Sequence, residues 1–231
     1  IANLLLNKLF GETRQLKGLP SKTSKVTTFS TSSYAPSSLN AIICRTNATA
    51  FEYFFKFHSY LNGEKKIRLE VDGKRSKDIF SGIFQLRANK RPTCKELQNF
   101  SSYQELVDHI QVFGEVEGAT TELKTFLDLT NQYSWQVIEW ALENSMADDE
   151  TDPKNTLVIS TSHKSKGLEW DNVLIAKGFN YKILDKKLMI SADEKRLLYV
   201  TVTRAKNILF TDGINDLLEH LNSKNMEISN A

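Results

Sequence analysis

Short apolar runs alternate with helical patterns at both ends of this sequence. The runs cover residues 40–44, 156–161, 172–176 and 207–211, and they read NAIIC, TLVIST, NVLIA and NILFT. Strands that are covered on both faces of a parallel sheet show such continuous apolar runs rather than strict alternation. Helical patterns at 48–61 and 191–206 lie next to these runs. This order is typical of the α/β class, and we expect a parallel sheet with helices on both faces.

The middle of the sequence has a different pattern. A strand-like segment at 66–71 is followed by helical patterns at 76–86, 101–114, 119–133 and 134–146. Ser76 is the expected cap of the first of these helices. We predict that residues 1–61 begin the α/β domain, residues 62–151 form a mostly α-helical insertion, and residues 152–231 complete the domain. The acidic segment 148–155 is expected to be an exposed linker at the end of the insertion.

Composition excludes several classes of protein. Of the 231 residues, 40% are hydrophobic and 25% are charged, which is typical of a globular chain and not of a disordered one. The net charge of +2 is too small to indicate a polyanionic partner, so any nucleic-acid surface has to be local. No apolar run approaches the ~20 residues that span a bilayer, and no signal peptide is visible.

Cysteine usage indicates a reducing compartment. Cys44 and Cys94 lie far apart in the sequence and form no metal-ligand pattern, so we expect two free thiols. Because the sequence starts at Ile1 within a helical pattern, we expect a fragment of a longer protein. We expect that protein in the cytoplasm of a prokaryote or the nucleus of a eukaryote, neither secreted nor in a membrane.

Two arginines occupy positions that often carry chemistry. Arg45 directly follows a predicted strand, where open α/β sheets bind ligands, and a guanidinium can bind phosphate oxygens in a bidentate manner. Arg204 lies at the junction of a predicted helix and strand, a rigid position that suits a catalytic arginine. Each also has a plainer interpretation. Arg45 can be a surface residue at a strand end, and Arg204 can simply stabilise a helix C-terminus.

The segment 162–173 reads SHKSKGLEWDNV and lies between two predicted strands. A phosphate loop needs the pattern G-x-x-x-x-G-K-[ST], whose backbone N–H groups surround the phosphates, and the sequence does not contain it. The acidic segment 147–150 follows a helical pattern rather than the apolar strand of a magnesium-binding motif. We therefore predict no metal site in this chain and no ATP hydrolysis by this chain alone.

Three stretches resemble the C-terminal motifs of the UvrD/Rep type of superfamily 1 DNA helicases. AIICRTNA (41–48) resembles motif IV, VISTSHKSKGLEWDNVLI (158–175) resembles motif V, and DEKRLLYVTVTRAK (193–206) resembles motif VI. Their order agrees with the family, whose insertion falls between motifs IV and V. The short insertion and the wording SHKSKGLEWD are closer to the F-box DNA helicase branch than to the bacterial repair helicases.

The resemblance implies a RecA-like domain that contributes to an ATP site. In this family ATP lies between two RecA-like domains, and the N-terminal one supplies the phosphate loop and the Mg²⁺ ligands. The second domain supplies arginines to the γ-phosphate, and Arg45 and Arg204 match those positions. Glu169 matches the residue that contacts the ribose, with Gly167 and Lys166 beside the nucleotide.

The resemblance also implies a DNA partner. His163 matches a position on the single-stranded DNA side of the same loop, and Lys164 is assigned to DNA beside it, although an exposed lysine needs no ligand. Trp170 replaces the usual phenylalanine. The resemblance implies an ATP-driven motor that moves 3′-to-5′ on single-stranded or partly duplex DNA, together with an N-terminal motor domain. The alternative is a non-catalytic helicase-like module that binds DNA or a partner.

Overall fold

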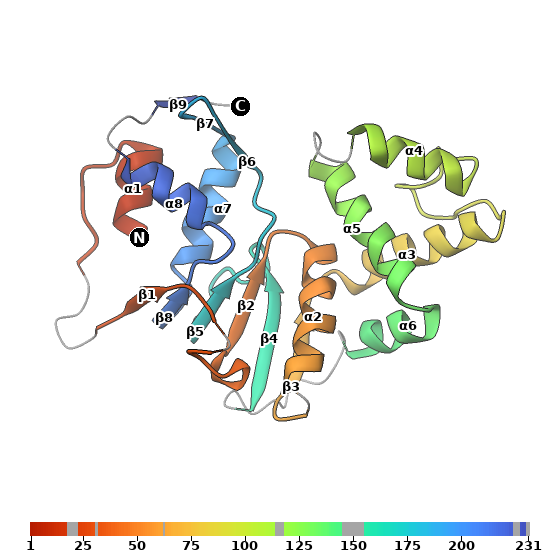
Figure 1. Cartoon of the computed structure of the whole chain (residues 1–231), viewed down its shortest axis with the longest axis horizontal. Coiled ribbons are helices and arrows are strands. Elements are labelled where there is room, and N and C mark those ends of the chain that lie inside the picture. The colour runs from red at the N-terminus through yellow and green to blue at the C-terminus, as the bar shows by residue number, and fades with distance from the viewer. Residues whose placement is uncertain are drawn as a thin grey trace.

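The computed structural model describes residues 1–17, 23–30, 32–61, 63–113, 118–144, 155–223 and 227–229, so the predicted linker at 148–155 lies outside the described residues except for its last position. Among the described residues, six strands form one sheet in which all neighbouring pairs are parallel (Figure 1). These strands are β1 (Lys25–Thr27), β2 (Ala41–Cys44), β3 (Lys66–Glu70), β4 (Thr156–Thr161), β5 (Trp170–Ile175) and β8 (Ala205–Phe210). Their order is β1-β8-β5-β2-β4-β3, so the predicted parallel α/β sheet is confirmed.

The central strands supply side chains to a hydrophobic core on each face of the sheet. Ile42 and Leu174 point into one core, whereas Ala41 and Ile43 point into the other. Helix α2 (Asn47–Leu61) covers the first face. The second face is covered by α1 (Ala2–Phe10), α7 (Ala192–Val202) and α8 (Asn215–Asn222) (Figure 1). Helices on both faces were predicted and are confirmed.

The middle of the chain folds into helices α3 (Gly73–Arg87), α4 (Tyr103–Phe113), α5 (Gly118–Gln132) and α6 (Trp135–Asn144) beside α2 (Figure 1). Aromatic side chains join this block to the sheet. Phe51 of α2 packs edge-to-face on Phe80 of α3 with ring centroids 5.3 Å apart, and Phe80 packs on Phe126 of α5 at 4.7 Å. The three rings are fully buried in the core that also holds Ile42. The insertion therefore shares one core with the sheet. In the described part of the chain, no helix is both long and apolar enough to cross a membrane.

Strand β3 lies at the edge of the main sheet and not in the insertion. The sequence-based division at residue 62 placed it in the insertion, and this placement is wrong because β3 pairs with β4 in parallel register. The helical block begins at α3 instead. Its cap is Asp72 rather than Ser76, since the Asp72 carboxylate accepts a hydrogen bond of 3.0 Å from the Arg75 N–H, while Ser76 is buried inside the helix.

A hairpin that was not predicted connects β5 to α7. Strands β6 (Tyr181–Leu184) and β7 (Lys187–Ile190) pair antiparallel, and β9 (Glu227–Ser229) pairs with β7. Asp185 and Lys186 form the turn with φ values of 49° and 65°. Two-residue turns of this kind are usually signalled by Asn-Gly or Asp-Gly, and Asp-Lys does not give that signal.

Candidate functional site

Arg45 and Arg204 lie at opposite edges of the main sheet. All parallel strands end at one edge, here called the carboxyl edge, and begin at the other, the amino edge. Arg45 directly follows β2 at the carboxyl edge, whereas Arg204 directly precedes β8 at the amino edge. Ile43 is level with Ile175 and Trp170 is level with Ala205, so a length equal to about eight residues of strand, roughly 25 Å, separates the levels of the two arginines. The structure does not bring them together around one phosphoryl group.

At the amino edge, Arg204 lies next to Glu169. The Arg204 Nη1 donates a hydrogen bond of 3.0 Å to the Leu168 carbonyl oxygen, and the Arg204 carbonyl accepts one of 3.0 Å from the Trp170 N–H. Both neighbours of Glu169 in the sequence are thus bonded to Arg204. The Glu169 side chain is exposed at this edge, and the Lys166 side chain is exposed in the turns before it.

The segment 162–169 runs from the carboxyl edge, where β4 ends, to the amino edge, where β5 begins. Two buried serines fix its start, because Ser162 Oγ donates to the Cys44 carbonyl at 3.2 Å and Ser165 Oγ donates to the Ser162 carbonyl at 2.9 Å. Gly167 has a φ of 86°, and no atom lies within 4 Å of a Cβ placed on it. Glycine is therefore favoured there by the positive φ of the turn and not by crowding from neighbouring atoms. The segment is an anchored crossover between two edges and not a phosphate loop.

At the carboxyl edge, Arg45 is held by the buried carboxylate of Glu194. The Arg45 Nε donates to both carboxylate oxygens, at 3.0 and 2.9 Å. The Glu194 side chain is 3% exposed and that of Arg45 is 29% exposed. The same carboxylate accepts a hydrogen bond of 2.8 Å from the Asn180 N–H. Arg45 and Glu194 thus join the end of β2, the first turn of α7 and the start of the hairpin.

The predicted DNA residues lie at the same edge as Arg45. His163 and Lys164 line a cavity of about 280 Å³ that extends to Arg75 of α3. His163 is exposed. The Lys164 Nζ donates a hydrogen bond of 2.8 Å to the Val71 carbonyl at the end of β3. Its ammonium therefore connects the crossover segment to the start of the insertion.

A second cavity, of about 580 Å³, adjoins the first. The two share Arg45, Thr46 and Glu122, and the second extends between α2, α5 and residues 177–180. Burial raises the pKa of Tyr53 in its wall to about 12. Burial also raises the pKa of the Cys44 thiol, which keeps this thiol protonated and unreactive. Among the described residues, no three His, Cys, Asp or Glu side chains come close enough to hold a metal ion.

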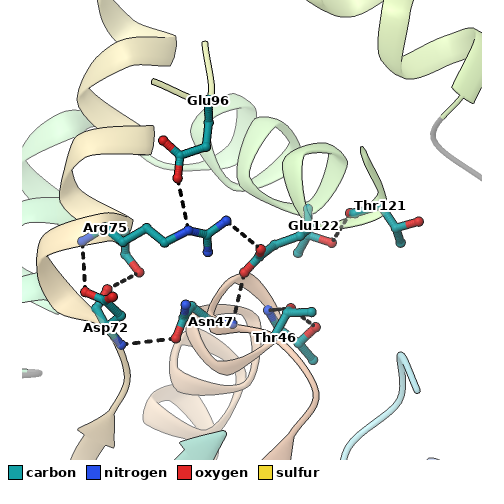
Figure 2. Close-up of polar contacts among 10 residues, drawn as sticks. Thr46, Asn47, Asp72, Arg75, Glu96, Thr121 and Glu122 are labelled. Carbon is teal, nitrogen blue, oxygen red and sulfur yellow. Dashed lines mark hydrogen bonds and ion pairs between the residues drawn. The ribbon is translucent and has the colours of Figure 1, made fainter. Parts of the chain in front are cut away.

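Two charged residues of the carboxyl edge were missed in the sequence. Arg75 donates from Nη2 to Glu122 Oε2 at 3.0 Å and from Nε to Glu96 Oε1 at 3.1 Å (Figure 2). Arg75 lies in the first turn of α3, after the end of β3, and the position of this turn at the carboxyl edge would have marked it once β3 was assigned to the sheet. Glu122 lies on α5, and no local pattern in the sequence connects it to this edge.

The parallel α/β sheet and the order of the motifs indicate a RecA-like domain of the helicase class. The sequence matches the UvrD-like helicase C-terminal domain family over residues 31–214, and the chain belongs to this family. The family predicted from the three motifs is therefore confirmed.

The chain is also similar to the F-box DNA helicase protein 1 of Schizosaccharomyces pombe (strain 972 / ATCC 24843). The two are 28% identical over 236 aligned positions, which cover 95% of this chain and 26% of that protein. This chain thus spans about a quarter of the length of this relative. The relative belongs to the branch that the wording of motif V indicated.

Proposed function

We propose that this chain acts as the C-terminal motor domain of an ATP-dependent DNA helicase or translocase that moves 3′-to-5′ on single strands. The observation that carries the proposal is the course of segment 162–169, whose ends lie at opposite edges of the sheet. A segment that contacts nucleotide at Glu169 and DNA at His163 transmits a shift at one ligand to the other.

At the amino edge, Arg204 is proposed to stabilise the charge of the transferred γ-phosphoryl group. An arginine in this role accelerates phosphoryl transfer by about 10³- to 10⁵-fold. Glu169 is proposed to accept a hydrogen bond from the ribose, with Gly167 and Lys166 beside the nucleotide. The phosphate loop and the Mg²⁺ ligands are proposed to come from an N-terminal motor domain, because the sequence contains neither pattern.

At the carboxyl edge, His163 and Lys164 are proposed to contact the phosphates of single-stranded or partly duplex DNA. Lys164 has to exchange its bond to the Val71 carbonyl for a phosphate oxygen. We do not propose Arg45 as a second catalytic arginine, because it lies at the carboxyl edge and its Nε is bonded to the Glu194 carboxylate. We propose that Arg45 positions the start of α7 instead.

One observation favours the alternative of a non-catalytic module. Arg204 already donates from Nε to the Val200 carbonyl and from Nη2 to the Thr203 hydroxyl, both at 2.8 Å, in addition to its bond to Leu168. These bonds use three of the five N–H donors of the guanidinium, as a structural arginine would, and two donors remain for a phosphate.

ATP hydrolysis by the complete gene product, measured with and without single-stranded DNA, separates the two. Turnover that rises with DNA supports the motor, and DNA binding without turnover supports the non-catalytic module. Unwinding of 3′-tailed against 5′-tailed duplexes tests the direction, and a preference for 5′ tails contradicts the proposed polarity.

A further inference from the structure

Arg75 is a cation at the carboxyl edge whose positive charge is offset by two carboxylates of the insertion. It lies in the first turn of α3 and lines the same cavity as His163 and Lys164. Two carboxylates bind its guanidinium. Glu122 comes from α5, and Glu96 comes from the segment between α3 and α4 (Figure 2). Because two carboxylates offset its charge, Arg75 attracts an external anion more strongly once one of them has moved.

Glu122 occupies the position that such an anion would take. Its side chain is 11% exposed, compared with 34% for Glu96. One carboxylate oxygen binds Arg75, and the other accepts a hydrogen bond of 3.2 Å from the Asn47 N–H at the start of α2. A phosphate group placed here would meet the same guanidinium and backbone donors.

The charges around the cavity favour this exchange. The described lining holds three cations and two carboxylates, namely Arg45, Arg75, Lys164, Asp72 and Glu122. Withdrawal of Glu122 leaves three cations against one carboxylate. Arg75 keeps Glu96 as a partner throughout, so its guanidinium is never left without a counter-charge.

We propose that Glu122 is an autoinhibitory carboxylate, which occupies Arg75 until a phosphate of single-stranded DNA displaces it. This inference rests on the proposed function, because it takes DNA to bind at the carboxyl edge. The Glu122–Arg75 contact between α5 and α3 then opposes DNA binding. Bound DNA in turn weakens the contact of α5 with the carboxyl edge. The insertion thereby sets the DNA affinity of the motor domain.

The test compares the complete gene product with its Glu122→Gln variant in binding to a fluorescent oligothymidine over a range of salt concentrations. We expect the variant to bind about fivefold more tightly, the effect of removing one competing anion. The slope of log K against log salt should stay nearly the same, because the phosphate contact to Arg75 forms in both proteins and only its competitor is removed. A carboxylate that only supports the fold would leave the affinity unchanged or lower it.

Glu96→Gln is the matched control, because Glu96 binds the same guanidinium but is not among the described residues that line the cavity. Its affinity should stay close to that of the wild type. If thermal unfolding shows that Glu122→Gln does not fold, Glu122→Asp decides, since it keeps the charge but shortens its reach. Tighter binding by that variant supports the inference, and equal or weaker binding overturns it.

The wild type separates the two proposals. If it binds the oligothymidine and a folded Glu122→Gln variant binds no more tightly, only the autoinhibitory role is overturned. If neither protein binds it, the proposed DNA contact fails, and the inference fails with it.

Discussion

The Arg204 guanidinium donates a hydrogen bond of 3.0 Å to the carbonyl oxygen of Leu168, the residue that precedes Glu169. The Trp170 N–H donates to the Arg204 carbonyl at the same distance, so the arginine is bonded on both sides of Glu169. A movement that carries the guanidinium away from Leu168 breaks this bond. Movement of the proposed catalytic arginine is thus linked to the residue proposed to hold the ribose.

Replacement of Arg204 by alanine should lower DNA-stimulated ATP turnover of the complete gene product by about 10³-fold or more, because charge on the phosphoryl group loses its partner. Arg204→Lys should also be strongly impaired, since an ammonium cannot bind two oxygens in the same plane. The exposed neighbour Lys206 provides the control, and Lys206→Ala should keep normal turnover. Near-normal turnover of Arg204→Ala would sink the assignment.

Replacement of Arg45 by alanine should mainly destabilise the fold. The buried Glu194 carboxylate would keep the Asn180 N–H but lose its counter-charge, which should lower the free energy of unfolding by about 2 kcal/mol. Urea unfolding measures this change. Arg196→Ala is the control, since the side chains of the Arg196–Asp193 pair are 68% and 88% exposed and such pairs contribute little. A large loss of turnover with unchanged stability would instead return Arg45 to a catalytic role.

Glu169 and His163 should affect different ligands, because they lie at opposite ends of the crossover segment. Glu169→Gln should raise KM for ATP by about tenfold, with little change in the Kd for single-stranded DNA. His163→Ala should weaken DNA binding and leave KM for ATP near its original value. Turnover at varied ATP and fluorescence binding of an oligonucleotide give the two constants. Variants that both changed the same constant would contradict a two-ended segment.

The buried phenol of Tyr53 should make stability depend on alkaline pH. Burial raises its pKa to about 12, so between about pH 10 and 12 the folded chain keeps a proton that the unfolded chain loses. The contribution is complete below pH 10 and is lost as the pH rises, by about 2–3 kcal/mol in total.

Urea unfolding at a series of pH values tests the role of Tyr53. The free-energy difference between the wild type and Tyr53→Phe should change only above about pH 10. Tyr60→Phe is the control, because the Tyr60 side chain is 48% exposed. Equal pH dependence of both variants would show that burial of Tyr53 is not the cause.

Most individual strands and helices could be predicted from the sequence, whereas the pairing of β3 with β4 could not. Apolar runs identified β2 and β4, since both strands are covered on both faces and need no alternation. The place of β3 was missed because it is decided by pairing with β4 across a long stretch of sequence. The turn at Asp185 and Lys186 was missed because its residues do not give the usual turn signal.

The separation of Arg45 from Arg204 could have been read from the sequence. One follows a strand and the other precedes a strand, and in an all-parallel sheet these positions lie at opposite edges. The tertiary partners could not be read in this way. Glu194 was recognisable as a residue in the first turn of a helix, but not as the carboxylate that binds Arg45. Glu122 reaches Arg75 only because α5 packs against α2 and α3.

The crossover at residues 162–169 has little spare length. From the end of β4 to the start of β5 it covers roughly 20 Å along the strands, out of the roughly 30 Å that a fully extended chain of this length would reach. Residues 162–167 lie in turns, which use up contour length. Extra residues can be accommodated as a bulge, whereas a deletion has to shorten a turn or shift one strand against the other. Because the segment has little spare length, a displacement at one edge of the sheet is transmitted to the other edge.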